Sequence, residues 1–186
     1  FEENDNTKNL TSKEKNAMIY RMLQIIEKND GKLSVEFYIE KTKKGNLRFN
    51  VEGNSLLRFK AEVFSVKAEE LTQEQLDMTA QDIFNFLRFD QGVNSPKFDI
   101  GEEYTEDTAL KIMAVRYAMF INRYKKYQTI TLASDVDDVT VAAIKENSAE
   151  LPGVDISEDT TRVYKDSKYF AHMLGYTGSV TTERLE

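Results

Sequence analysis

Apolar residues recur every three or four positions in several stretches of the chain, and most of these stretches begin with a helix-capping sequence. The first follows Thr11-Ser12-Lys13-Glu14, which has the spacing of a capping box. Ile19, Leu23 and Ile26 then form one apolar stripe, and Asn29-Asp30-Gly31 is typical of a helix end. The pattern predicts an amphipathic helix that begins at Thr11 and stops at Asn29.

Two further helices are predicted in the middle of the chain. The first covers Leu56 to Phe64, where Leu56, Phe59 (or Lys60), Val63 and Phe64 fit a 3.6-residue period. The second is opened by Thr72-Gln73-Glu74-Gln75, another capping box. We expect it to continue as one helix through its apolar positions, which are Leu76, Ala80, Ile83 and Leu87.

Residues 90–104 contain glycine, asparagine, serine and proline and are predicted to form a loop. Thr105 then caps what we expect to be the longest helix, with acids in its first turn and Arg123, Lys125 and Lys126 in its last. This order of charges suits the helix dipole. The aromatic and methionine residues of this helix are more simply core residues than a ligand site: Met113, Tyr117, Met119 and Phe120.

Strand-like alternation of apolar and polar residues is confined to short segments. It runs over 33–39 and 47–51 around the turn Lys43-Lys44-Gly45-Asn46, which predicts a hairpin over 33–51. Residues 127–133 are also strand-like, and a short helix is expected from Ser134/Asp135 through Ile144. Leu151-Pro152-Gly153 predicts a turn, with short extended segments at 154–156 and 161–164 and a helical turn at 170–174. This mixture, without a regular βαβ rhythm, predicts an α+β fold.

Composition narrows the class of protein. The 186 residues can fill one domain or two small subdomains, and 40% of them are hydrophobic, as in folded proteins. A net charge of −7 argues against nucleic acid as a partner. The chain has no cysteine, so disulfides and thiolate chemistry are excluded. No stretch reads as a signal peptide or a membrane span, and we expect any membrane anchor to lie before Phe1.

The chemistry-bearing residues do not assemble into a convincing active site. His172 is the only histidine and lies in an apolar helical turn, where a packing role is the simpler interpretation. Asp135, Asp137 and Asp138 could bind a hard cation, but acids at a helix start are favoured by its free N–H groups. No phosphate-binding glycine loop occurs. We therefore predict no cofactor and no metal. A hydrolase that uses these three acids remains a minor alternative.

The last third of the chain resembles class B penicillin-binding proteins. The resemblance is carried by a helix within 135–150, the Leu151-Pro-Gly-Val154 turn, an Arg-x-Tyr element at Arg162 and Tyr164, and Ala171-His-Met-Leu-Gly-Tyr-Thr-Gly178. It covers residues 130–180; over 11–126 only the succession of helices matches. The family usually has proline after Arg-x-Tyr, where this chain has Lys165. The variants with an inserted head region that it resembles are the elongation-type proteins of Gram-positive bacteria.

The catalytic signature of that family is Ser-x-x-Lys, Ser-x-Asn and Lys-Thr/Ser-Gly. Ser12-Lys13-Glu14-Lys15 matches the first by letters alone, and the other two do not occur in the sequence. The resemblance thus implies the non-catalytic N-terminal module of a peptidoglycan transpeptidase. The residues to which it assigns a structural role are Pro152, Gly153, Arg162, Tyr164, His172, Gly175, Tyr176 and Gly178.

The resemblance also implies an organisation and a set of partners. The fold would be an elongated pedestal, with residues 1–156 as a head subdomain of helices plus hairpin and 157–186 as part of the base. The implied partners are the parent's own transpeptidase domain and a glycan polymerase of the SEDS family, together with self-association. The parent would be held by one N-terminal helix at the extracytoplasmic face of the cytoplasmic membrane. The alternative is an unrelated extracytoplasmic adaptor or ligand-binding module.

Overall fold

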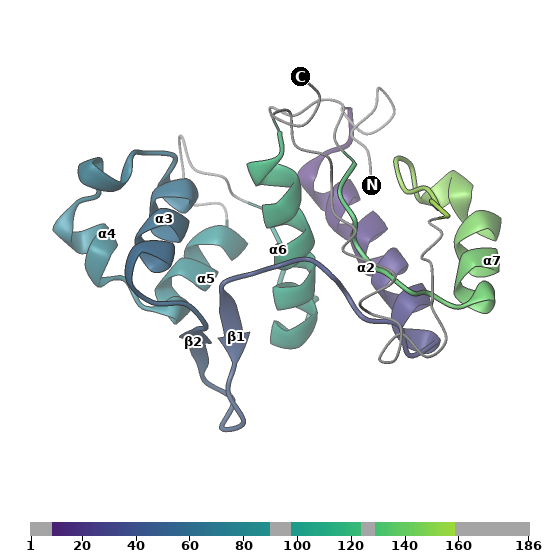
Figure 1. The fold of residues 1–186 in the computed structure, drawn as a ribbon, viewed down its shortest axis with the longest axis horizontal. Coiled ribbons are helices and arrows are strands. Elements are labelled where there is room, and N and C mark those ends of the chain that lie inside the picture. Colours follow the sequence, from purple (N-terminus) through teal and green to yellow (C-terminus); the bar gives the residue numbers. More distant parts are fainter. Residues whose placement is uncertain (1–8, 90–97, 124–128, 159–186) are drawn as a thin grey trace, which may run out of the picture. The chain divides into compact units, whose positions relative to one another are not determined.

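The computed structural model describes residues 9–89, 98–123 and 129–158 (Figure 1). The chain divides after Ile156 into one unit of residues 1–156 and a second of residues 157–186. Of the second unit, only Ser157 and Glu158 belong to the described residues. The assignment of the first unit to a head and of the second to a base stays a prediction.

The first unit combines helices with one small sheet, which confirms the α+β class. Strands β1 (Ile39–Lys41) and β2 (Leu47–Phe49) are antiparallel, with Glu40 opposite Arg48. The helices are α2 (Ser12–Lys28), α3 (Gly53–Phe64), α4 (Gln73–Asp77), α5 (Ala80–Arg88), α6 (Glu106–Ile121) and α7 (Asp138–Glu146), and two short 3₁₀ turns are η1 (Ala68–Glu70) and η2 (Ser148–Glu150).

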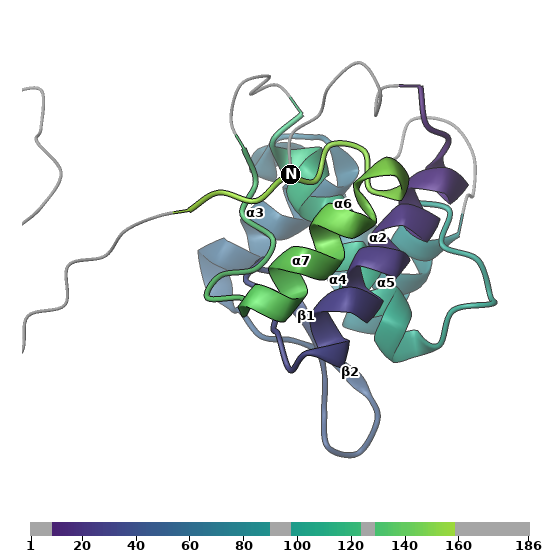
Figure 2. The ribbon, with the colours of Figure 1, turned by 90° about the vertical axis from the view of Figure 1, so that its right-hand side faces the viewer.

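The helices are arranged in a row in which α6 and α2 are the central pair (Figure 1). Helix α5 contacts α6 on one side and is accompanied by α3 and α4, while the hairpin contacts α5 and α6. On the other side, α7 lies against α2 (Figure 2). Helix α2 therefore packs against α6 and against α7, and its remaining face is exposed to solvent.

The core is centred on α6, whose side chains are buried around most of its circumference. Ile112, Met113 and Val115 are fully buried and Tyr117 is 1% exposed. Met119 and Phe120 are partly buried against the same core, which confirms the packing role predicted for this helix. At one end of the core, the ring of Phe59 makes edge contacts with four other aromatic rings, those of Phe37, Tyr38, Phe49 and Tyr117.

Helix α2 forms as the sequence predicts. The Thr11 hydroxyl accepts from the N–H of Glu14, and the Glu14 carboxylate accepts from the N–H of Thr11, which is the reciprocal capping box. The N–H of Thr11 and the hydroxyl of Thr11 both donate to the Glu14 carboxylate, and they lower the pKa of Glu14 because they favour its ionised form. The predicted stripe of Ile19, Leu23 and Ile26 is buried to within 2% exposure, and the helix ends before Asn29.

The single helix predicted from Thr72 to Leu87 is wrong, because the structure contains two. Helix α4 stops at Asp77, and Thr79 begins α5 with a capping box of its own, in which its hydroxyl accepts from the N–H of Asp82 at 3.2 Å. At the break, the buried ammonium of Lys60 donates to the carbonyls of Leu76 at 2.5 Å and Met78 at 2.8 Å. These charge-assisted bonds replace the backbone bonds that a continuous helix would have made.

Two predictions about α6 are also wrong. The helix has 16 residues and is shorter than α2, which has 17. It ends at Ile121, before the basic residues expected in its last turn. Asn122 terminates it, since the Asn122 side-chain amide donates to the Ala118 carbonyl at 2.9 Å and competes for the last turn. Arg123 therefore lies beyond the helix, while Lys125 and Lys126 are outside the described residues. The predicted N-cap at Thr105 is confirmed.

The loop prediction for 90–104 is confirmed for residues 98–104, which contain neither helix nor strand. Backbone carbonyls hold this segment in place. The side-chain amide of Asn16 donates to the carbonyls of Phe98 and Asp99, both at 2.8 Å. From α5, Arg88 donates to the carbonyl of Tyr104 at 2.7 Å. The segment is thus attached to both α2 and α5.

The predicted strands are shorter in the structure. The hairpin is regular over 39–49 rather than 33–51, and its turn at residues 43–46 is confirmed. Leu33 forms only a single bridge with Ala133, and the described part of the strand predicted over 127–133 contains no other ladder pair. Alternation alone does not make a strand where no neighbouring strand completes the hydrogen bonds.

Candidate interaction surface

Helix α7 and the turn that follows it lie beside α2, and this turn contains the predicted site residues Pro152 and Gly153. The helix begins at Asp138, after the predicted start at Ser134/Asp135, because Asp137 is its N-cap and accepts from the N–H of Thr140 at 2.8 Å. Hydrogen bonds from Thr140 lower the pKa of Asp137. The carboxylate thus has the capping role predicted for this acidic cluster. Within the described residues, no group of three or more acids, histidines or cysteines could hold a metal.

The predicted turn at Leu151-Pro152-Gly153 is confirmed. The N–H of Val154 donates to the carbonyl of Leu151 at 3.1 Å, and Gly153 has φ +79°. Proline followed by a left-handed glycine is the pattern of a type II turn. Leu151 is 1% exposed and ties the turn to the core. The other predicted site residues lie outside the described residues: Arg162, Tyr164, His172, Gly175, Tyr176 and Gly178.

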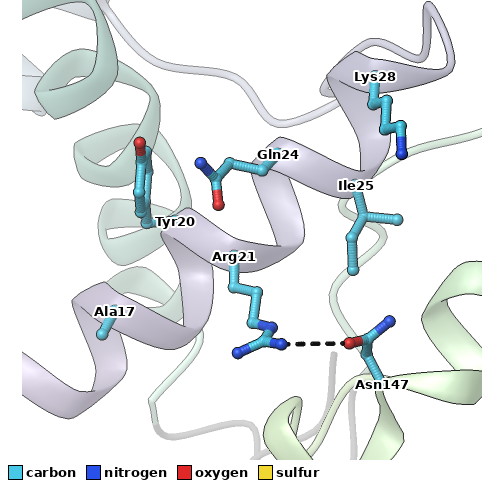
Figure 3. Close-up of a pocket in the computed structure, with 7 residues that line it drawn as sticks. All are labelled: Ala17, Tyr20, Arg21, Gln24, Ile25, Lys28 and Asn147. Carbon is cyan, nitrogen blue, oxygen red and sulfur yellow. Dashed lines mark hydrogen bonds between the residues drawn. The ribbon is translucent and has the colours of Figure 1, made fainter.

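Two adjoining hollows lie along the outer face of α2. The larger, of about 460 Å³, is shown in Figure 3 and is closed at one side by Asn147. The smaller, of about 350 Å³, extends toward the start of α2 and is bordered by Glu150 and Pro152. Ala17 and Arg21 line both hollows. The predicted turn residue Pro152 therefore borders a surface that α2 supplies.

Arg21 crosses from α2 to the segment after α7. Its guanidinium donates to the Asn147 side-chain oxygen at 3.4 Å, as Figure 3 shows, and forms an ion pair with Glu150. The side chains of Arg21 and Glu150 are about half exposed, so their pairing adds little to stability. The pairing holds the Arg21 side chain in an extended position on the surface, where it lines both hollows.

Among the residues that the structure describes, this surface has side chains suited to binding, and the hydrogen bonds found there form no nucleophile–base pair. Ser12, which matches the first letter of the transpeptidase signature, is the first residue of α2, and its hydroxyl accepts from the Arg116 guanidinium at 3.2 Å. An acyl-transferring serine needs a base within hydrogen-bond reach and an oxyanion site. A guanidinium cannot act as that base, because it has no acceptor and stays protonated.

Sequence reasoning missed the side chains on the exposed face of α2, namely Ala17, Arg21, Gln24 and Lys28. The reason is that helix prediction reads the apolar, buried stripe. A signal was present, since these residues follow Glu14 at intervals of three, four, three and four positions, which places all five on one face. No helix within the described ranges is long and apolar enough to cross a membrane.

The comparison with protein families decides what kind of domain this is. The sequence model of the penicillin-binding protein dimerisation domain matches residues 5–186. The chain belongs to this family. No curated protein matches the sequence. The match covers nearly the whole chain, whereas the resemblance read from the sequence is carried by residues 130–180.

Membership in the penicillin-binding protein dimerisation domain family explains the chemistry of the described residues. This is a non-catalytic domain, so helix caps and a turn where an active site was sought are what the family leads us to expect. The alternative of an unrelated adaptor is set aside by the match over residues 5–186. The name of the family points to self-association, which directs attention to surfaces such as the face of α2.

Proposed function

We propose that this dimerisation domain is the extracytoplasmic scaffold and interaction module of a class B penicillin-binding protein, of the elongation type found in Gram-positive bacteria. The observation that carries the proposal is the family match over residues 5–186. The order of sequence elements in 130–180 supports the class B assignment, and the inserted helices and hairpin between residues 12 and 121 support the elongation type.

The parent protein, in this proposal, is a serine D,D-transpeptidase that cross-links peptidoglycan and is held in the cytoplasmic membrane by one N-terminal helix. This domain would set the height of the transpeptidase domain above the membrane. It would also contact a glycan polymerase of the SEDS family. The densely packed core around α6 supports this role, because a domain that holds another at a set distance has to be rigid.

Labelling with a fluorescent penicillin tests the non-catalytic part of this proposal. The 186-residue chain should remain unlabelled, because the sequence contains neither Ser-x-Asn nor Lys-Thr/Ser-Gly, and the Ser12 hydroxyl accepts from the Arg116 guanidinium, which cannot act as a base. The whole penicillin-binding protein should take up one label. A covalent adduct on the 186-residue chain, mapped by mass spectrometry to Ser12, would overturn the proposal.

The partner part of the proposal is tested by co-purification from membranes. A tagged parent that contains this domain should retain the SEDS-family polymerase, and a parent in which residues 1–186 are replaced by an unrelated rigid domain should lose it. Equal retention by both proteins would show that the contact is made elsewhere.

A further inference from the structure

The charged residues on the exposed face of α2 are placed so that the face of a second, antiparallel α2 would have opposite charges facing them. Glu14 and Lys28 lie seven positions before and after Arg21, so each is about 10 Å from it along the helix. All three are exposed and share one face of the helix. Ala17 and Ile25 are likewise equally distant from Arg21, on its two sides.

A second copy of α2 that lies antiparallel to the first, with a two-fold axis at Arg21, would bring opposite charges together. Glu14 of each copy would face Lys28 of the other, and the contact would occur twice, as two-fold symmetry requires. Ala17 of each copy would face Ile25 of the other. A small residue opposite a larger one lets two helices approach closely.

The residues of this arrangement also line the two hollows. Ile25 and Lys28 line the larger hollow, Glu14 lines the smaller, and Ala17 and Arg21 line both. Reversal of the helix therefore places the larger hollow of one copy over the smaller hollow of the other. At the axis the two Arg21 side chains would approach each other, and the ion pair of Arg21 with Glu150 in the same copy reduces their repulsion.

We propose that two copies of this domain associate through the α2 face in an antiparallel, two-fold arrangement centred on Arg21. The inference rests on the proposed interaction role of the domain and on the self-association to which the family name points, and it adds the surface and the antiparallel arrangement of the two copies. The association is weak, because its charged pairs are exposed and each copy carries a net charge of −7.

Charge reversal distinguishes this contact from any effect within one copy. Glu14 and Lys28 are about 21 Å apart along α2 and cannot pair with each other in the same chain. In Lys28→Glu each dimer contains two glutamate–glutamate contacts, and in Glu14→Lys it contains two lysine–lysine contacts. Sedimentation of the 186-residue chain should therefore show a dimer dissociation constant at least about tenfold higher for each single variant.

Variants that restore opposite charges at both contacts provide the decisive test. The double variant Glu14→Lys/Lys28→Glu restores both attractive pairs, and so does an equimolar mixture of the two single variants, which should form heterodimers. The matched control is Lys44→Glu, which makes the same charge change at an exposed position in the hairpin turn and should leave association unchanged. Far-ultraviolet circular dichroism verifies that each variant is folded.

Glu14 also belongs to the capping box of α2, so a variant that keeps the cap guards against a failure to fold. Glutamine at this position retains the reciprocal bond. Glu14→Gln should weaken association of the wild-type chain but strengthen association of Lys28→Glu, because it removes an attraction in the first case and a repulsion in the second. The same sign of effect in both backgrounds would overturn the proposal.

A wild-type chain that stays monomeric at millimolar concentration, or single variants that associate like wild type, would also overturn it. These results leave the penicillin-labelling and co-purification tests unaffected, since neither depends on association of two copies. A labelled 186-residue chain would conversely refute the scaffold role whatever its oligomeric state.

Discussion

A hydrogen bond between Tyr117 and Glu62 connects α6 to α3, beside the aromatic rings that surround Phe59. We predict that its contribution to stability depends on pH. The Tyr117 hydroxyl donates to Glu62 Oε2, while Arg58 donates to Glu62 Oε1 at 3.0 Å. Tyr117 is 1% exposed. Burial of the ring, followed by the hydrogen bond to the carboxylate, raises the pKa of Tyr117 well above its ordinary value of 10.

Tyr117→Phe removes one hydrogen bond to a charged acceptor, which generally contributes about 1.5–3 kcal/mol. The Glu62 side chain is 31% exposed and keeps Arg58 as a partner, so we expect the lower end of that range. The predicted loss in the free energy of unfolding at pH 8 is therefore about 1.5 kcal/mol.

Alkaline pH should erase this difference. The pKa of Tyr117 is raised in the folded state, so its contribution is complete below pH 10 and is lost as the pH rises above 10, where the unfolded chain releases the proton first. At pH 11 an unfolded tyrosine with a pKa of about 10 favours unfolding by about 1.4 kcal/mol. Tyr117→Phe has no such proton to lose, so its stability should equal that of wild type near pH 11.

Urea denaturation of wild type and Tyr117→Phe between pH 8 and pH 11 measures both quantities. Tyr38→Phe is the matched control, because its ring belongs to the same cluster and is only partly buried. A difference between wild type and Tyr117→Phe that stays constant from pH 8 to pH 11 would refute the reasoning, and so would a Tyr117→Phe chain as stable as wild type at pH 8.

Three further predictions concern stability and can be measured by urea denaturation at pH 7. Lys60→Met should lower the free energy of unfolding by about 2 kcal/mol, because it leaves the carbonyls at the α4–α5 break without their ammonium partner, whereas Lys43→Met at the exposed turn should change it by less than about 0.5 kcal/mol. Thr105→Ala should cost about 1 kcal/mol through loss of the α6 N-cap, and Thr105→Ser should restore most of this; equal losses in both would exclude a capping role. Gly153→Ala should cost about 1 kcal/mol, because φ +79° disfavours a side chain; an unchanged stability would contradict the left-handed turn.

Local signals predicted the parts of the fold that are determined locally. The box at Thr11 and Glu14 and the cap at Thr105 consist of residues within one helical turn, so their spacing was sufficient. The break between α4 and α5 is different, because the ammonium of Lys60, a residue of α3, takes the carbonyls that the break exposes. The second capping box, at Thr79 and Asp82, was nevertheless present in the sequence.

The short strands and the end of α6 could not be predicted from periodicity. Residues 33–37 alternate as a strand does, yet only Leu33 finds a bridge partner, in Ala133. A strand requires a neighbour, and the position of that neighbour is a property of the whole fold. Helix α6 is buried on most sides, so it lacks an apolar stripe whose last member would have marked its end at Ile121.

The candidate surface was predicted only where it includes a turn. Pro152 and Gly153 have a distinctive backbone geometry, which a sequence reveals directly. The face of α2 consists of exposed apolar, polar and charged side chains. It forms two hollows only because the folded chain places Asn147 and Pro152 beside it.

We propose that this domain contributes shape and contacts, while bond making is performed elsewhere in the parent protein. The most direct measurement is the rate and stoichiometry of acylation by a labelled penicillin in the whole parent protein carrying Ser12→Ala. We predict one label per chain and the wild-type rate, because Ser12 only begins a helix and accepts a bond from Arg116. Loss of labelling in this variant would contradict the claim.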